Sequence, residues 1–125
     1  MPVITVDVWL YGALARRGRK AAQGSFANLK MRLPEGSTMA VLLARLGVRT
    51  EERGVTFING QLSAMPGLQP DLGHLLRDGD RVGLFDLRSM WPFQYRHGVA
   101  MIGEMAEAMH ASKDSGLHHT YESPE

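Results

Sequence analysis

Two segments near the N-terminus alternate apolar and polar residues with a period of two, and this pattern constrains the fold more strongly than any other. The segments are 3–11, which reads VITVDVWLY, and 26–33. Successive side chains of a strand point to opposite faces, so both are predicted to be strands with one buried face. The predicted inward residues are Ile4, Val6, Val8, Leu10, Ala27, Leu29, Met31 and Leu33. The intervening residues 12–24, rich in Gly, Ala, Arg and Lys, are predicted to form a long hairpin loop.

An amphipathic helix is predicted after this hairpin. Pro34 has no N–H to give to a strand ladder, so it ends the second strand, and residues 36–38 (Gly-Ser-Thr) supply a turn with helix N-cap residues. Within 39–46 the apolar residues follow the i, i+3, i+4, i+7 spacing of one helix face. Gly47 is suited to ending this helix in the left-handed conformation.

Short strands after the helix complete the predicted sheet. Residues 55–58 are β-branched and aromatic, and the Asn-Gly pair at 59–60 is the strongest two-residue hairpin signal in the chain. Residues 61–64 can form the returning strand, and 81–87 can form the last one. The Asp-Gly-Asp segment at 78–80 is predicted to be a turn and not an acid–base pair. The predicted architecture is therefore α+β in the order ββαββ, with the helix packed on one face of a mixed sheet.

Composition narrows the class of protein. The chain has 125 residues, which suits one domain with an appendage. It contains no cysteine, so disulfides, iron–sulfur clusters and thiolate zinc sites are excluded. The formal net charge is +1, and no segment reaches the roughly 18 apolar residues of a membrane span. Nucleic acid and membrane are not expected as partners, and the cytoplasm is the expected location.

Five motifs in order carry a resemblance to a known family. They read VDVWLYG, LPEGST, LLARLG, FING and LRDGDRVGLF, and they lie within residues 3–87. In this combination the chain resembles the MoaD/ThiS sulfur-carrier group of ubiquitin-like proteins. The resemblance implies a β-grasp domain over residues 1–88. It also implies, as possible partners, the E1-like and pterin-synthase enzymes with which such carriers work in molybdenum cofactor biosynthesis.

The chain departs from this family where the family performs its chemistry. Members end in Gly-Gly, and the terminal glycine is adenylated and converted to a thiocarboxylate. Glycines are needed because a thin tail without Cβ atoms must enter the active sites. Met90 and Trp91 stand in this place, and the chain continues to Glu125. No sulfur-carrying residue, catalytic residue or cofactor is therefore assigned.

Residues 89–125 form an extension beyond the predicted domain. A helix is expected at about 97–112, followed by a polar tail. Its apolar stripe, rich in adaptable methionine, favours contact with a partner or with a second copy of the chain, although the helix could also fold back onto its own domain. The outer face of the helix at 39–46 has Arg45 as its only charge, so it too could be covered. The residues predicted to bind a partner are Ile102, Met105, Met109, Trp91 and Phe93.

A basic segment and the histidines are the other candidates. Arg16, Arg17 and Arg19, with Lys20, could dock an acidic surface or could be a solvated loop tip, and the sequence favours neither reading. The paired histidines at 118–119 lie in a polar tail without a fixed scaffold, so no metal site is predicted.

The sequence favours a non-catalytic, ubiquitin-like accessory or structural subunit that binds a larger enzyme or assembly. The alternative is a sulfur carrier for molybdopterin, tungstopterin or thiamin-type biosynthesis that works through an atypical or processed C-terminus. A third reading is a regulator that mimics a sulfur carrier and occupies its enzyme unproductively. All three predict a protein partner.

Overall fold

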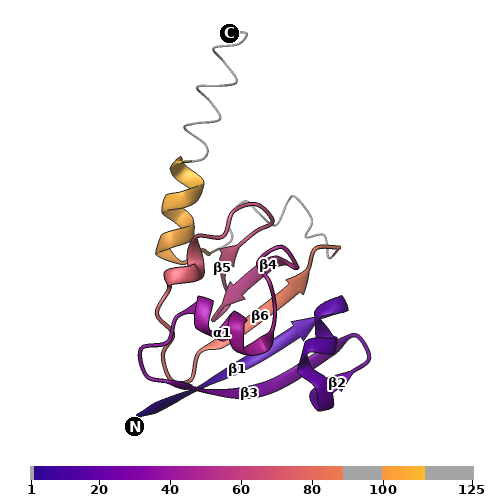
Figure 1. Ribbon diagram of the computed structural model, residues 1–125. Coiled ribbons are helices and arrows are strands. Elements are labelled where there is room, and N and C mark those ends of the chain that lie inside the picture. The colour runs from indigo at the N-terminus through magenta and orange to yellow at the C-terminus, as the bar shows by residue number, and fades with distance from the viewer. Residues whose placement is uncertain (1, 89–99, 112–125) are drawn as a thin grey trace.

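The chain folds as an α+β protein (Figure 1). The computed structural model describes residues 2–88 and 100–111. In chain order the elements are β1 (Val3–Tyr11), the 3-10 helix η1 (Gly12–Ala21), β2 (Ala22–Gln23), β3 (Phe26–Pro34), α1 (Met39–Leu46), β4 (Arg53–Ile58), β5 (Gln61–Ala64), the 3-10 helix η2 (Pro70–Gly73), β6 (Arg81–Asp86) and a C-terminal helix, 103–111. The predicted strands and the first helix are confirmed, and β4 begins earlier than predicted.

The six strands form one mixed sheet in the order β2-β3-β1-β6-β4-β5. β1 and β6 lie side by side and parallel, although most of the chain separates them, and the other neighbours are antiparallel. The central strands β1, β6 and β4 each have a neighbour on both edges. This topology places residues from distant parts of the sequence in common rows across the sheet.

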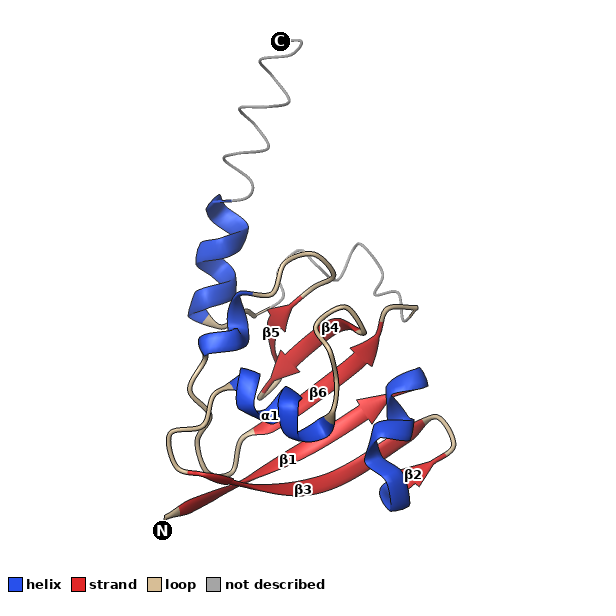
Figure 2. Cartoon of the chain, in the orientation of Figure 1, coloured by secondary structure: helices blue, strands red, loops and turns tan. Residues whose placement is uncertain are grey.

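One face of the sheet, called the inner face from here on, is covered by α1 and η1 (Figure 2). The four predicted inward residues of β1 are buried, and so is the apolar stripe of α1, which includes Leu42 and Leu46. Gly47 ends α1 with φ 74°, as predicted. Thr38 occupies the N-cap position, as predicted, but its side chain makes no cap hydrogen bond, and the Ser37 hydroxyl donates instead to the carbonyl of Pro34.

The predicted inward face of β3 is buried only in part. Ala27 and Leu33 are buried, but Leu29 and Met31 are half-buried. β2 pairs with β3 only as far as Ala27, so the rest of β3 forms an edge of the sheet. Side chains at such an edge have neighbours on one side only.

The segment predicted to be a loop at 12–24 is ordered, and that prediction is wrong. It contains η1 and the short strand β2. Leu14, Ala15 and Gly18 of η1 are buried, and Gly18 lies so close to the Ala27 side chain that it leaves no room for a Cβ. The few apolar residues of this basic segment gain enough from burial over the end of the sheet to order it.

Both predicted tight turns are confirmed. Asn59 and Gly60 have φ of 53° and 80°, which is the type I′ geometry that suits a two-residue hairpin between β4 and β5. The Asp80 carboxylate accepts hydrogen bonds from the Arg77 N–H and from the Asn59 side chain. Asp78 accepts one from the Thr5 N–H, so both acids hold turns in place.

Residues 100–111, the described part of the C-terminal extension, fold back onto their own domain. The Leu62 N–H donates to the Ala100 carbonyl at 2.8 Å, and the Ile102 N–H donates to the Leu62 carbonyl at 3.1 Å, so the chain continues the sheet along the edge of β5. Ile102 and Met105 are buried in the core. Within the described residues, the C-terminal helix is shorter than the predicted 97–112. It does not cover the solvent-facing side of α1, where Ala40 and Ala44 remain exposed.

Candidate protein-interaction surface

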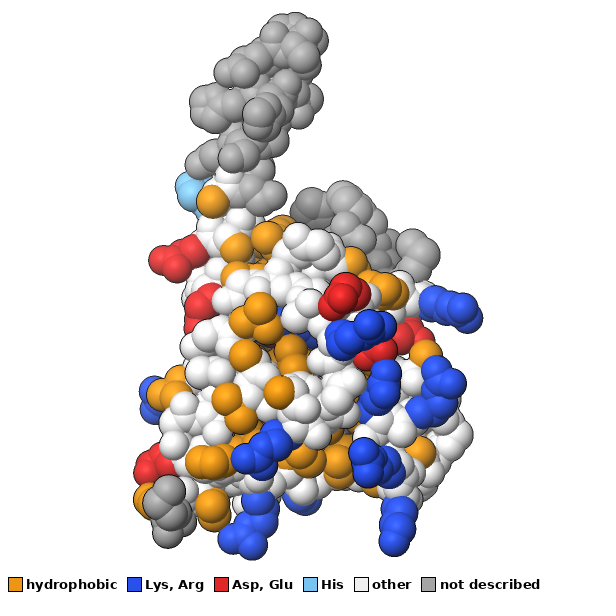
Figure 3. Space-filling model, viewed as in Figure 1, with side chains coloured by type: hydrophobic (Ala, Val, Ile, Leu, Met, Phe, Trp, Pro, Cys, Tyr) orange, Lys and Arg blue, Asp and Glu red, His pale blue; other side chains and the backbone are white. Residues whose placement is uncertain are grey.

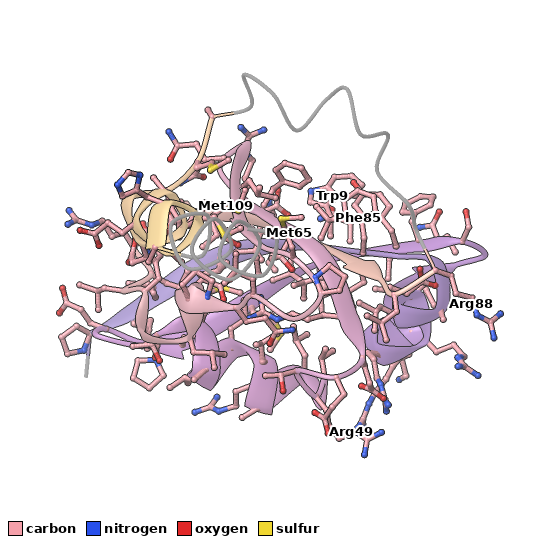
Figure 4. All side chains as sticks on the ribbon, turned by 90° about the horizontal axis from the view of Figure 1, so that it is seen from above. Trp9, Arg49, Met65, Phe85, Arg88 and Met109 are labelled. Atoms are coloured by element: carbon pink, nitrogen blue, oxygen red, sulfur yellow. The ribbon has the colours of Figure 1, made fainter. Side chains whose placement is uncertain are left out.

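The face of the sheet opposite α1, called the outer face, carries a cluster of aromatic side chains. Because strand side chains alternate, the residues of β1 that alternate with the buried ones point to this face, and two of them, Trp9 and Tyr11, are aromatic. Neighbouring strands add three more rings. Figure 4 shows Trp9 and Phe85 on this side of the sheet. The aromatic row consists of Phe26 on β3, Trp9 and Tyr11 on β1, Phe85 on β6 and Phe57 on β4, all half-buried.

The rings of the aromatic row contact one another in sequence. Trp9 stacks on Phe26 with centroids 6.0 Å apart, and Tyr11 stacks on Phe85 at 4.5 Å with planes 14° apart. Trp9 also stacks on Tyr11, and Phe57 meets Phe85 edge to face. Such pairs contribute about 0.5–1.5 kcal/mol each beyond the area they bury. The rings are therefore a preorganised surface.

A glycine interrupts the row. Gly83 of β6 is the cross-strand neighbour of Trp9 on one side and of Phe57 on the other. The position between these two rings therefore has no side chain. An open hollow of about 370 Å³ lies there, lined by Trp9, Tyr11, Phe57, Phe85 and Arg81, with Gly83 on the floor.

Charged groups lie beside the rings. Asp7 accepts hydrogen bonds from the Asn28 side chain at 2.7 Å and from the Trp9 indole N–H at 3.3 Å, and its carboxylate lies 3.5 Å from the Lys30 ammonium. The Asn28 bond, followed by those of Trp9 and Lys30, holds the pKa of Asp7 below its usual value. Asp7 is thus ionised, and it fixes the Trp9 ring. In the described part of the chain, the guanidinium of Arg81 has no carboxylate partner.

The structure brings Arg16 and Arg17 together on η1, away from the aromatic row. Lys and Arg side chains gather on this side of the molecule (Figure 3). Arg17 pairs with Glu52 at 2.6 Å, and both arginines line an open hollow of about 600 Å³ that Arg88 also lines. A hydrogen bond from the Arg49 N–H, followed by the Arg17 contact, lowers the pKa of Glu52. Arg19 is exposed.

The other predicted partner-binding residues lie elsewhere. Ile102 is 5% exposed and Met105 0%, so the expectation that these two side chains face a partner is corrected: they complete the domain's own core. Met109 is half-buried and, like Met65, packs against the core (Figure 4). Trp91 and Phe93 lie outside the described residues.

A hydrogen-bond contact between His74 and Glu104 helps to hold the described part of the extension in place. His74 Nδ1 lies 2.7 Å from a carboxylate oxygen of Glu104, on the first turn of the C-terminal helix. Glu104 has a lowered pKa, first because of its own backbone N–H and then because of His74. His97, His118 and His119 lie outside the described residues.

A fully buried ion pair lies on the inner side of the sheet, where it joins β4 to η2. Arg53 of β4 forms two hydrogen bonds to Asp71 of η2, at 2.6 and 2.8 Å, and neither side chain is exposed. Ser63 of β5 donates a further bond to Asp71 at 2.8 Å. These groups join β4, β5 and η2, and because solvent does not reach them, their role is structural.

The aromatic row was not predicted from the sequence, although the signal was present. The alternation that identifies the inward residues also identifies the outward ones, and Trp9, Tyr11, Phe26, Phe57 and Phe85 all occupy outward positions. An outward position in a solvated strand is normally polar. Aromatic residues there point to a surface that something else covers.

No protein-family model matches this chain, and no curated protein matches it. In residues 2–88 and 100–111, no helix is long and apolar enough to cross a membrane.

Proposed function

We propose that this protein is a non-catalytic β-grasp subunit that docks on a larger enzyme or assembly through the aromatic row on its outer face. The observation that carries the proposal is the row itself: five rings from four strands, in contact with one another and half-exposed on a face that no described helix covers.

The arrangement of the strands supports the β-grasp assignment. The five longer strands follow the order β3-β1-β6-β4-β5, with β1 and β6 parallel at the centre and α1 packed on one face. This is the arrangement expected of a ubiquitin-like domain, and it agrees with the motifs in residues 3–87. In such a sheet, the face away from the helix is free to bind.

The chemistry of the aromatic row favours binding over catalysis. The hollow is lined by four aromatic rings, Val82, two glycines and the guanidinium of Arg81, and these residues do not include a nucleophile beside a base. Aromatic residues and arginine are the side chains most enriched at the centres of protein interfaces. Clustered apolar surface of this kind marks an interaction site on a small protein.

Co-purification with matched variants tests the proposal. Tagged wild type, the double variant Tyr11→Thr with Phe85→Thr, and the control Ala40→Ser with Ala44→Ser are expressed in the native host. Wild type and control are expected to recover the same partner, and the double variant to lose it while staying folded by circular dichroism. The partner, purified separately, should rebind wild type. A partner that binds the folded double variant as tightly as wild type would refute the docking surface.

A further inference from the structure

We infer that the hollow over Gly83 is a receptor for one apolar side chain of the protein partner, with a carboxylate of that partner beside it on Arg81. The inference rests on the proposed function and names the chemistry of its partner. The apolar side chain would be aromatic or long and aliphatic. It would supply the side chain that is missing from the row between Trp9 and Phe57.

The spacing of the strands sets the size of the receptor. Neighbouring strands lie about 4.8 Å apart, so Trp9 and Phe57, with β6 between them, are separated by roughly 10 Å at their backbones. Nonbonded carbon atoms pack best about 3.5–4.0 Å apart, so one layer of side chain fits between the two rings. Tyr11 and Phe85, stacked in the neighbouring row, close one end of the hollow.

The fold does not require glycine at position 83. A Cβ built there would lie 3.8 Å from the Tyr11 ring, which is an ordinary contact, and the backbone is not in the left-handed region. Gly54 differs, because a Cβ there would lie 2.5 Å from the Asp86 carbonyl oxygen. Glycine weakens a strand interior and often marks the close approach of a ligand or another chain. Gly83 fits this second role, whereas packing accounts for Gly54.

The charges around the hollow select the occupant. A box of aromatic rings can bind a cation, but the guanidinium of Arg81 at the rim would repel one. Arg81 instead lacks a carboxylate within the described residues, while the carboxylate of Asp7 is already engaged by Asn28, Trp9 and Lys30. A partner carboxylate on Arg81 would form a charge-assisted hydrogen bond at the edge of an apolar contact.

A single-stranded nucleic acid fits the surface less well. Bases bind by stacking on ring faces, but here the near-parallel rings are stacked on one another. Asp7 and Asp78 line a second hollow at the same end of the sheet together with Lys30 and Arg81, so its charges balance and give no net attraction to a chain of phosphates. A protein segment that pairs an apolar residue with an acidic one is the occupant that the described residues favour.

Selection from a phage-displayed library of random peptides on the immobilised full-length protein tests the inference. Enriched peptides are expected to share an aromatic residue, leucine or methionine with Asp or Glu within two positions. Synthetic peptides from the pool are then measured by calorimetry. Gly83→Val should weaken binding by about tenfold or more, because its side chain fills the hollow. Gly73→Ala, at an exposed glycine of η2 with open space around it, should leave affinity unchanged.

The variant Arg81→Glu separately tests the proposed contact with a carboxylate of the partner. Selection on this variant should replace the acidic residue of the peptides by Lys or Arg and retain the apolar one. Both variants should keep the melting temperature of the wild type within a few degrees, and valine in a strand should if anything raise it.

Several results would overturn the inference. These are peptides without the apolar and acidic pair, affinity indifferent to Gly83→Val, a dT12 oligonucleotide that binds at the hollow more tightly than the peptides, or a wild-type dimer that Gly83→Val dissociates in the absence of peptide. If the native partner is lost on Tyr11→Thr with Phe85→Thr but kept on Gly83→Val, the docking surface stands and the receptor fails. If the partner still binds both variants, the proposed docking surface itself is refuted, and not only the receptor.

Discussion

The two faces of the sheet are built from the same strands but from different side chains. On the inner face, β1 and β6 present aliphatic residues such as Val6, Val8 and Leu84, all with 0% exposure beneath α1 and η1. On the outer face, the same strands present Trp9, Tyr11 and Phe85, which remain half-exposed. The inner face serves the domain's own stability. The outer face keeps apolar rings in water, which a solvated strand face does not need, and we propose that these rings bind a partner.

Substitutions on the two faces should lower the free energy of unfolding by different amounts. The largest decrease is expected at the buried ion pair on the inner side of the sheet. Asp71→Ala leaves the Arg53 guanidinium buried without its partner and should lower the free energy of unfolding by about 3–5 kcal/mol. Urea denaturation measures it. The double variant Arg53→Met with Asp71→Leu should recover part of the loss, because it removes the unpaired charge. A single variant as stable as wild type would show that water reaches the pair.

The described part of the extension should contribute to stability in the same way as the core on the inner side of the sheet. Met105→Ala removes a fully buried side chain and should cost about 2–5 kcal/mol. Leu75→Ala, at a side chain that is 48% exposed, should cost within about 0.5 kcal/mol and serves as the control. Thermal unfolding of both variants compares them. If Met105→Ala keeps the wild-type melting temperature and loses the partner instead, the C-terminal helix is a binding element after all.

On the outer face, a substitution should have separate effects on stability and on partner binding. Phe85→Thr removes two ring pairs, the stacking on Tyr11 and the edge contact with Phe57, so it should lower stability by about 1–3 kcal/mol. The same variant should weaken partner binding by about tenfold or more, as expected for an interface hot spot. Calorimetric unfolding and a binding titration on one preparation give both numbers. A large loss of stability would make the aromatic row a second core and not a docking surface.

The smallest effect should appear at low pH. The pKa of Asp7 is lower in the folded state than its ordinary value of 3.8, so Asp7 stabilises the fold above that pH, and this contribution is lost as pH falls through the lowered pKa. Asp7→Asn should therefore lose less stability than wild type between neutral pH and about pH 2. Urea denaturation across this range measures the difference. Equal losses in both proteins would mean that the Asn28 and Trp9 bonds to Asp7 do not persist in solution.

Local features of the sequence predicted most of the strands and helices. Alternation identified β1 and β3, apolar spacing identified α1, and the Asn-Gly pair identified the hairpin after β4, because each signal depends on neighbours within a few residues. The outward aromatic residues of the candidate site were open to the same reasoning. The prediction failed at η1, where a few buried apolar residues outweigh a basic, glycine-containing composition.

The sequence by itself determined which side of each strand is apolar, where the chain turns, and that aromatic residues occupy outward positions. Only the tertiary structure decided which of these residues meet. Gly83 lies between Trp9 and Phe57 because three strands from distant parts of the chain share one row, and a shift of register by one residue would move every side chain to the other face. The Arg53–Asp71 pair and the return of Ile102 to β5 likewise depend on contacts between segments far apart in sequence, which no local pattern records.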